Sequence, residues 1–488
     1  MTIGPGPGPG RRAGSAERRG ALVLSLLCAV QFMVILDTTI ANVALPSIGR
    51  EFALAEGDMQ YVITLYAVTF GGFLVLSGRL GDLLGRRRLF TGGTVLFVAS
   101  SAGCGLAARV EILLVARTLQ GLGAALISAT ALSLLLVIHA EGTGRNRALG
   151  IWSGLGASGA GAGLILGGVL TDTLGWRAVF LVNVPIGAVA LLLTGVLPRD
   201  GQVTWDRTKL DLPGAVTITA GIGLLIHGLG LGRQTGFSAP ATMSVLAAVV
   251  LLTAFVLIQR RSASPLVPLR IAGRGPVAGA NLAIICLTAV MGGQGFFLIL
   301  YMQGVLGYSS LQTGLAVLPS AMMAVIGSTL ASRVTAKVPP WLVAVAGLAM
   351  VAAGELLLAR ITVHGTYLTD LLPGYLLFGL GLAAAFVGAS IVGSNGASAE
   401  EHGVVSGLLN TSQQVGIALG VSTLVTLAVA HTGAQDDPAA TAALVAGYRF
   451  GLLASAVLAA AGGLALLLLG KGTKADAGEL RDGCTSAA

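Results

Sequence analysis

One acidic residue lies inside the first apolar run of the chain. Asp37 follows Gln31-Phe-Met-Val-Ile-Leu and precedes Thr-Thr-Ile-Ala-Asn. A charged side chain at the centre of a bilayer costs roughly 2.5–3.5 kcal/mol on insertion scales, so it is retained where a bundle interior or a water-filled cavity uses it. The chemistry that this residue offers is the binding and release of a proton along a transport pathway.

A second deep charge is Arg117, in the run Arg117-Thr-Leu-Gln-Gly-Leu-Gly-Ala-Ala. At 1.5 Å per residue, Arg117 and Asp37 lie about 9 and 12 Å below the predicted outer ends of their runs, so their side chains can meet. Such a pair is a proton switch, because burial favours the neutral acid whereas a nearby arginine favours the charged form. The alternative is a static buried ion pair that only fixes packing.

The composition is that of a membrane protein. Hydrophobic residues make up 55% of the 488 residues and charged residues only 10%, whereas soluble domains carry about 25% charged residues. The mean hydropathy is +0.87. The net charge of +8 is spread over short loops, which indicates membrane orientation and excludes nucleic-acid binding.

The chain contains many apolar runs of about 20 residues, and each can cross the hydrocarbon core as a helix. We predict an all-α integral membrane protein with 14 transmembrane helices. Most of the 29 Lys and Arg residues fall on the side of the N-terminus, so both termini are expected in the cytoplasm. The predicted spans are 21–45, 60–77, 90–107, 111–136, 148–170, 178–197, 212–230, 240–258, 276–303, 311–332, 340–359, 371–394, 404–430 and 445–469.

The two longest cytoplasmic linkers, 198–211 and 259–275, divide these spans into six, two and six. This 6+2+6 order predicts a duplicated transporter whose substrate site lies between two six-helix bundles. The central pair is interpreted as an insertion with a packing or lipid-facing role. The predicted units are a disordered tail at 1–20, an N-terminal bundle at 21–197, a central pair with linkers at 198–275, a C-terminal bundle at 276–470 and a tail at 471–488.

The loop after the second run has an unusual pattern of glycine and charge, and we interpret it as a cytoplasmic gating loop. Glycine permits a sharp turn beneath two helices, and an acid beside a helix N-terminus is stabilised by the macrodipole. The pattern resembles the signature of the major facilitator superfamily, although Leu83 stands where that family usually has Arg. Its key residues are Gly78, Asp82, Gly85, Arg86, Arg87 and Arg88.

The loop from Asn395 to Gly403 has no Lys or Arg and carries Glu400 and Glu401. One hypothesis is a cytoplasmic latch in which these acids face the arginines of the gating loop, closed in the outward-facing state and open in the inward-facing one. The alternative, equally weighted, is two solvated acids at a helix start.

The fifth run is rich in glycine. Gly159, Gly163 and Gly167 share one helix face, followed by Gly168, and would let a neighbouring backbone approach closely. The segment resembles the antiporter motif of the same superfamily, with Leu164 in place of the expected proline.

Further motifs narrow the resemblance to the fourteen-span drug:proton antiporter family. They are Leu36-Asp37-Thr-Thr, Trp176 to Gly187, Tyr301 to Ser309 and Gly403 to Asn410. The resemblance implies export of lipophilic drugs or antibiotics across the cytoplasmic membrane in exchange for protons, by alternating access, with the proton gradient and no cofactor as the driving force. The expected partners are a small substrate, protons and membrane lipids, and the expected state is a monomer.

Glu355 is the other acid well inside a run, and we interpret it as interfacial because it is near an outer end, with Arg360 close by. A single deep carboxylate favours neutral or monocationic substrates. Eight polar residues are candidates to line an apolar substrate cavity, although each has helix–helix hydrogen bonding as its commoner role. They are Gln31, Tyr66, Gln120, Trp152, Asn281, Gln294, Asn410 and Gln414.

Other classes of protein lack their motifs. The chain has no Gly-x-x-x-x-Gly-Lys-Ser/Thr loop, which excludes an ATP-driven pump, and its four Cys and five His residues have no metal-ligand spacing. We therefore predict no catalytic and no metal-binding residues. Export of an endogenous secondary metabolite or siderophore, proton:solute symport and a membrane enzyme are the alternative functions, in that order.

Overall fold

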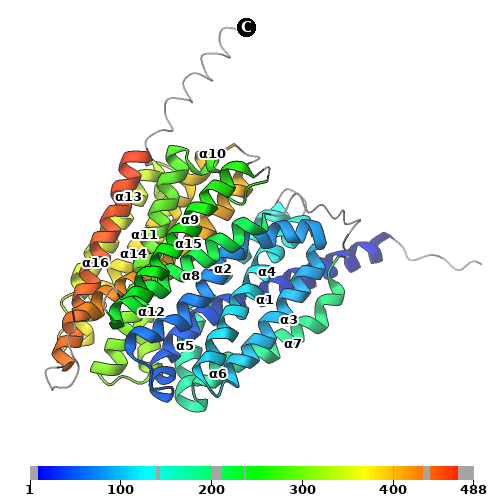
Figure 1. Cartoon of the computed structure of the whole chain (residues 1–488). Helices are drawn as coiled ribbons and strands as arrows, with labels where there is room; N and C mark the ends of the chain where they lie inside the picture. Colours follow the sequence, from blue (N-terminus) through cyan, green and yellow to red (C-terminus); the bar gives the residue numbers. More distant parts are fainter. Residues whose placement is uncertain are drawn as a thin grey trace, which may run out of the picture.

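The computed structural model describes residues 9–138, 143–198, 200, 211–235, 238–262, 264–398, 401–431 and 440–470. Within these residues all regular secondary structure is helical (Figure 1). The predicted tail at 471–488 and the first eight residues lie outside the described part. Residues 9–20 of the predicted disordered tail belong instead to the first helix, which begins at Pro9.

The N-terminal helices pack on one another. The strongest contacts join α3 to α4, α2 to α4 and α1 to α5. Their bounds are α1 (Pro9–Glu51), α2 (Glu56–Leu84), α3 (Arg86–Gly105), α4 (Val110–Ile138), α5 (Thr143–Leu174), α6 (Trp176–Leu181), α7 (Asn183–Leu193) and the 3-10 turn η1 (Thr194–Val196).

The C-terminal helices form a second packed group, in which α13 lies against α14 and α16, and α11 against α15 and α16. Two π-helical segments, η3 (Tyr301–Val305) and η4 (Tyr367–Leu371), end α11 and precede α14. The helices are α11 (Gly275–Leu300), α12 (Ser310–Val334), α13 (Pro340–Leu358), α14 (Leu372–Asn395), α15 (His402–Ala430) and α16 (Ala440–Leu469).

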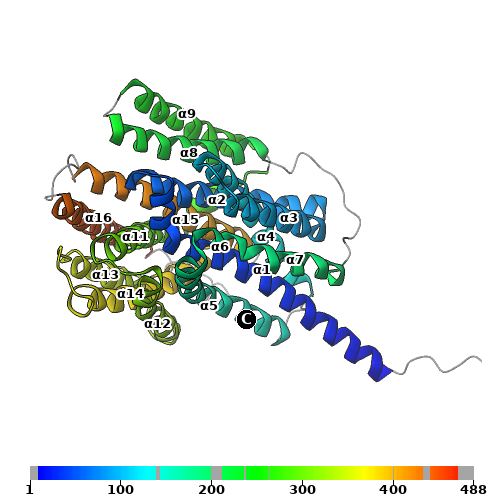
Figure 2. The ribbon, with the colours of Figure 1, turned by 90° about the horizontal axis from the view of Figure 1, so that it is seen from below.

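Two further helices lie between these groups in the chain. They are α8 (Leu212–Thr235) and α9 (Ala239–Arg261), which form an antiparallel pair at the edge of the molecule (Figure 2). Helix α8 packs on both α2 and α15, which come from different groups. The pair therefore covers the seam between α2 and α15 on one side. The short α10 (Leu269–Ala272) follows. The division into independent domains stays a prediction.

The inner end of this pair is tied to the rest of the molecule. Buried Asp211 accepts hydrogen bonds from the Gln259 side chain (2.6 Å) and from the backbone N–H of Gly214 (2.9 Å). The Arg79 guanidinium, from the predicted gating loop, donates to the carbonyl oxygens of Ser264 and Pro265 in the segment after α9. The pair is thus attached to α2 through backbone acceptors.

The prediction of 14 transmembrane helices is wrong, because twelve helices of the described residues are long and apolar enough to cross a membrane. The predicted spans 90–107 and 148–170 correspond to α3 and α5, which are not among the twelve. Helix α3 begins with three arginines and is interrupted by Thr, Ser and Gly. In the part of α5 whose side chains the structure describes without interruption, Gly161–Leu174 is an apolar segment shorter than a span. The predicted 6+2+6 arrangement requires fourteen spans, so it is wrong as well.

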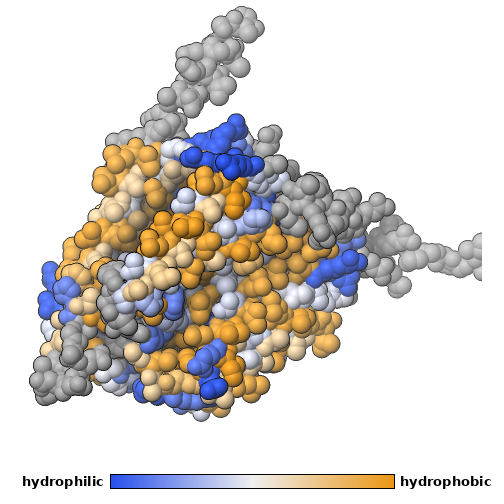
Figure 3. Space-filling model, viewed as in Figure 1, coloured by the Kyte–Doolittle hydropathy of each residue, from blue (hydrophilic) through white to orange (hydrophobic). Residues whose placement is uncertain are grey.

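Apolar side chains cover most of the visible sides of the helices, and strongly hydrophilic residues gather mostly toward their ends (Figure 3). Leu192 is 84% exposed and Val457 is 71% exposed. In water such surface would be unfavourable, whereas in a bilayer it contacts lipid tails. The chain is a multi-pass membrane protein.

Candidate transport site

Asp37 lies at the centre of a buried polar cluster formed by α1, α3, α4 and α7. Its Oδ2 accepts a hydrogen bond from Arg117 Nη1 (2.8 Å). Its Oδ1 accepts from Gln120 Nε2 (2.8 Å) and from Asn183 Nδ2 (2.7 Å). Asp37 is 0% exposed and Arg117 is 1% exposed. The structure thus brings together the two deep charges that the sequence singled out.

The surroundings of Arg117 fix its position. Its Nε donates to the carbonyl oxygen of Val62 on α2 (2.9 Å), and Nη1 also donates to Gln120 Oε1 (2.8 Å). The guanidinium carbon lies 4.3 Å from the centroid of the Tyr66 ring, a geometry that favours a cation. Since burial penalises both charges, these contacts are what offsets their desolvation.

Two members of this cluster were missed in the sequence. Asn183 begins α7, and Ser101 of α3 accepts from Gln120 Nε2 (2.5 Å) and from Asn183 Nδ2 (3.3 Å). Both are fully buried. Asn183 stands in the motif Trp176 to Gly187 and is polar in an otherwise apolar run, so it could have been identified, whereas nothing distinguishes Ser101 from other serines.

The eight candidate cavity residues do not form one group. Gln120 and Tyr66 belong to the Asp37 cluster. Asn281 accepts from Ser412 (2.6 Å), which joins α11 to α15, and Gln414 of α15 faces α2. The remaining candidates are exposed at Asn410, half-buried at Gln31 and Trp152, and buried at Gln294.

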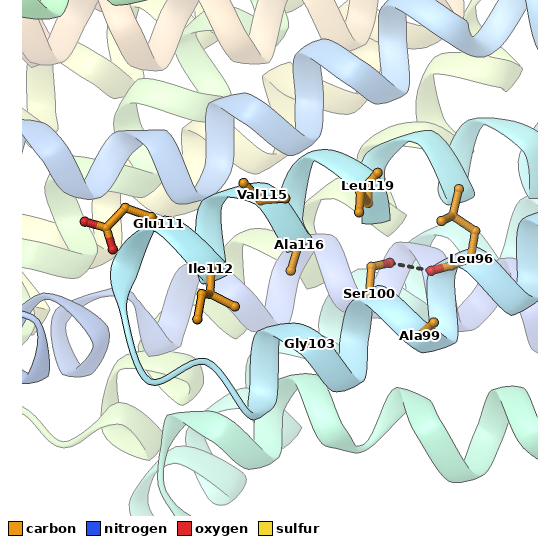
Figure 4. A pocket seen from close by; sticks show the side chains of 9 residues that line it. All are labelled: Leu96, Ala99, Ser100, Gly103, Glu111, Ile112, Val115, Ala116 and Leu119. Atoms are coloured by element: carbon orange, nitrogen blue, oxygen red, sulfur yellow. Dashed lines mark hydrogen bonds between the residues drawn. The ribbon is translucent and has the colours of Figure 1, made fainter.

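A groove of about 450 Å³ lies between α3 and α4 (Figure 4). The α4 side chains Ile112, Val115 and Leu119 in its lining are 43–61% exposed. Gly103 and Ala99 line the α3 side. Since Arg117 and Gln120 occupy the buried face of α4, this groove opens away from the Asp37 cluster and toward lipid. It is not the transport pathway.

The interfacial interpretation of Glu355 is wrong. The residue is 0% exposed, and neither carboxylate oxygen has a hydrogen-bond partner. Arg360 is exposed and no contact of the described residues joins it to Glu355. The distance along a helix from its end predicts depth in the membrane, but the neighbouring helices α14 and α16 are what bury this side chain.

The glycine face of α5 packs against α1. A Cβ at Gly159 or Gly167 would lie 3.1 Å from Ile35 or Ile40, and one at Gly163 would overlap the Thr39 hydroxyl. Gly168 instead faces α12, where a Cβ would lie 2.5 Å from the Leu311 Cα. The motif thus allows close packing of α5 on two helices from different groups.

The two groups also meet at the predicted outer side. Asp172 of α5 accepts from the backbone N–H groups of Ser310 (3.0 Å) and Leu311 (2.9 Å) at the start of α12. Gln303 of η3 donates to the carbonyl oxygen of Val43 on α1 (3.0 Å). At the inner side, a Cβ at Gly78 would have open space. We infer that the described structure is closed at its outer ends.

The predicted gating loop is a sharp turn between α2 and α3. Gly85 has φ = +98° and ψ = 127°, a conformation that side chains disfavour. The side chain of Asp82 lies outside the described residues. Instead, Asp200 accepts from the backbone N–H groups of Arg87 (2.9 Å) and Arg88 (3.2 Å), and so caps the N-terminus of α3.

Removing this cap is expected to destabilise the loop. We predict that Asp200→Ala lowers the free energy of unfolding by about 0.5–2 kcal/mol, the usual cost of losing an acidic N-cap. Asp200→Asn, which keeps one of the two accepting oxygens, serves as the control and should lose less. Thermal unfolding of both purified variants measures the difference, and equal losses would contradict the capping role.

In the described structure, whose outer ends are closed, Glu401 pairs with other arginines than those of the gating loop, and the latch stays a prediction for the outward-facing state. The Glu401 carboxylate accepts from the Arg274 guanidinium (2.5 and 3.1 Å) and lies 3.9 Å from Arg270. Arg270 lies in α10 and Arg274 directly precedes α11, so this ion pair does not join the N-terminal helices to the C-terminal helices. Glu400 lies outside the described residues. The Arg274 hydrogen bonds lower the pKa of Glu401 to about 2.

This pKa sets the pH range of the ion pair. Because the folded-state pKa is depressed, the pair stabilises the protein above the ordinary value of 4.5 and is lost as pH falls toward about 2. We expect the difference in melting temperature between wild type and Glu401→Gln to be constant from pH 7 to about 5 and to shrink below that. A difference that disappears near neutral pH would contradict the assignment.

Within the described residues no group of three or more His, Cys, Asp or Glu is placed to hold a metal ion. The site that remains is a buried acid, an arginine and neutral polar groups. Such a site can bind a proton or compensate a cation, and it offers no nucleophile beside a base.

Known proteins with similar sequences include antibiotic export and resistance proteins. Residues 27–421 match the family model described as the Major Facilitator Superfamily. The chain is 38% identical over 434 residues, 88% of each chain, to the cephamycin export protein CmcT of Amycolatopsis lactamdurans. It is 36% identical over 428 residues to the puromycin resistance protein of Streptomyces alboniger, covering 86% of this chain and 84% of that one.

A solved structure shares the fold. The bacterial homologue of the human lysosomal transporter Spinster, in its inward-facing and occupied conformation, superposes with a TM-score of 0.67 at 17% identity. The match covers 92% of this chain and 96% of that one.

Proposed function

Because the chain belongs to the major facilitator superfamily, we propose that it exports lipophilic antibiotics or related drugs across the cell membrane in exchange for protons. The relatives named for cephamycin export and puromycin resistance support this substrate class. The observation that carries the coupling is the buried pair of Asp37 and Arg117, 2.8 Å apart. The protein acts as a transporter and not as an enzyme, and it works as a monomer among membrane lipids.

The cluster couples the two fluxes through competition for Asp37. The contacts of the Asp37 carboxylate with Arg117, Gln120 and Asn183 stabilise its charged form against the cost of burial. A helix movement that separates Arg117 from Asp37 removes the largest of these interactions, so the acid takes up a proton. Proton affinity thus differs between conformations, and this difference links the gradient to transport.

Exchange of one proton for one monocation moves no net charge. A pH difference of one unit then supplies about 1.4 kcal/mol, which supports roughly a tenfold concentration difference of the drug. Neutral drugs would be exported with additional help from the membrane potential.

The experiment is efflux of puromycin and of ethidium, a fluorescent lipophilic cation, from cells that express the protein. Export should require the protein and should stop when a protonophore collapses the gradient. Accumulation inside the cell would instead support symport. If neither compound is moved and growth is protected against no other antibiotic, drug export is wrong.

A further inference from the structure

Glu355 differs from Asp37 in every contact. Asp37 has three polar partners, whereas both oxygens of Glu355 lack one although the residue is 0% exposed. An isolated ionised carboxylate in such a place is too costly, and the group neutralises instead by binding a proton. One of the two deep acids is therefore paired, and the other has only a proton to neutralise it.

Among the described residues, no charged group of α14, α16 or η4 forms a hydrogen bond or ion pair with Glu355, and Asp370 of η4 instead accepts from the backbone N–H of Thr366 (2.7 Å). On α14, the neighbouring titratable residue is buried Tyr375, preceded by Tyr367 in η4. On α16, Arg449 is exposed and donates to the carbonyl oxygen of Ala359, while Tyr448 is buried. None of these supplies a counter-charge to the carboxylate in this conformation.

The packing against α14 is tight. A Cβ at Gly354, next to Glu355, would lie 2.9 Å from the backbone nitrogen of Phe378 and 3.1 Å from the carbonyl oxygen of Gly374. Separation of α13 from α14 is therefore a movement that would let water reach the carboxyl. Access of protons to Glu355 depends on the position of α14.

The outer end of α14 is connected to the contacts that close the outer side. It begins with the π-helical segment η4, a geometry that is rare and frequent at functional sites. The Tyr367 hydroxyl in η4 donates to the carbonyl oxygen of Ala316 on α12 (2.7 Å). The first turn of α12 is in turn held by Asp172 of α5. Opening the outer side pulls on α14 through this chain of contacts.

We propose that Glu355 is a second proton-binding residue, which holds its proton while the outer side is closed and exchanges it when α14 moves. This proposal rests on the proposed proton exchange. It makes Glu355 a second titrating acid of the protein besides Asp37. Because the closed state binds the proton more tightly, external acid favours closure and external alkali favours opening. Two titrating acids would allow exchange of two protons for one substrate.

The protonation state can be measured directly by infrared spectroscopy of the purified protein in lipid nanodiscs at pH 7. We expect a carbonyl stretch of a neutral carboxyl group in the wild type and in Asp37→Asn. The band should be absent in Glu355→Gln, which has the same shape without the acid. Glu111→Gln, the same change at an exposed carboxylate, is the matched control and should keep the band. No difference between wild type and Glu355→Gln overturns the proposal.

The linkage to the outer side has its own measurement. Ser310→Cys, in a background without the native cysteines, reports opening by its labelling with a water-soluble thiol reagent, because Ser310 is 4% exposed in the closed structure. Raising the external pH from about 6 to 9 increases the thiolate fraction in every variant, and the protein with Glu355 intact should show a further rise in labelling of about 5- to 150-fold, the usual range of coupling between two sites. Glu355→Gln should show only the rise in labelling that the thiolate fraction accounts for.

An unchanged pH dependence in Glu355→Gln would make Glu355 a fixed neutral packing residue and overturn the proposal. Neither experiment needs a transported drug. A failure of drug efflux would therefore contradict the proposed function while leaving the proton on Glu355 in place.

Discussion

Asp37→Asn is expected to abolish efflux that is driven by a pH gradient. Asparagine keeps the shape of the side chain but cannot bind and release a proton. The change also leaves the Arg117 guanidinium buried without its counter-charge, and breaking a buried ion pair in this way costs about 3–5 kcal/mol. We expect both complete loss of gradient-driven efflux in vesicles and a lower free energy of unfolding.

A double variant separates these two effects. Asp37→Leu combined with Arg117→Met removes both charges, and replacement of a whole buried pair by apolar residues is often neutral for stability. We expect the double variant to regain most of the lost stability while efflux stays absent. Gradient-driven efflux at the wild-type rate in Asp37→Asn would show that the proton is carried elsewhere.

The second large effect is expected from a single methyl group on α5. In Gly168→Ala the new Cβ would lie 2.5 Å from the Cα of Leu311 and 2.8 Å from the carbonyl oxygen of Ser310. Both atoms are backbone, so α5 and α12 must move apart at their outer ends. Overpacking of this kind costs about 1–3 kcal/mol, which lowers the population of the closed state roughly 5- to 150-fold.

The expected result is a protein that stays open to the outside and transports at least about tenfold more slowly. Labelling of Ser310→Cys should rise in parallel. Gly161→Ala is the matched control, since it adds the same methyl group to the same helix in open space. Gly314→Ala, whose Cβ would lie 2.3 Å from the Leu164 carbonyl oxygen, should reproduce the effect from the α12 side. Normal efflux in Gly168→Ala would contradict the gate.

The sequence predicted those parts of the site that depend on depth in the membrane or on spacing along a single helix. Asp37 and Arg117 are rare charges at similar depth, and Gly159, Gly163 and Gly167 recur at the spacing of one helix face. Such features need no knowledge of which helices are neighbours. The resemblance to the superfamily followed from motifs along the chain, first of all the loop Gly78 to Arg88.

The errors arise where neighbouring helices decide the outcome. Glu355 was expected at an interface because it is near a helix end, but α14 and α16 cover it. The ion pair of Glu401 with Arg274 was not expected either. The N-cap of α3 comes from Asp200, more than a hundred residues beyond the loop, and no local pattern identifies it.

The span count failed for a different reason. Transfer of a helix into lipid depends on its average polarity, and α3 and α5 owe their place to packing against other helices as well as to apolar side chains. Glycine-rich segments are only weakly apolar, so a run of small residues that packs closely can be mistaken for a lipid-crossing segment.

The position of α8 has a consequence for how a drug reaches the protein. A compound dissolved in the inner half of the bilayer could enter laterally between the two helix groups at either of two contacts, α2 with α15 or α5 with α12. At the seam of α2 and α15 it meets α8, which bridges both helices. Lateral entry is therefore one-sided and runs between α5 and α12, whose inner ends can part while their outer ends stay joined at Gly168 and Asp172.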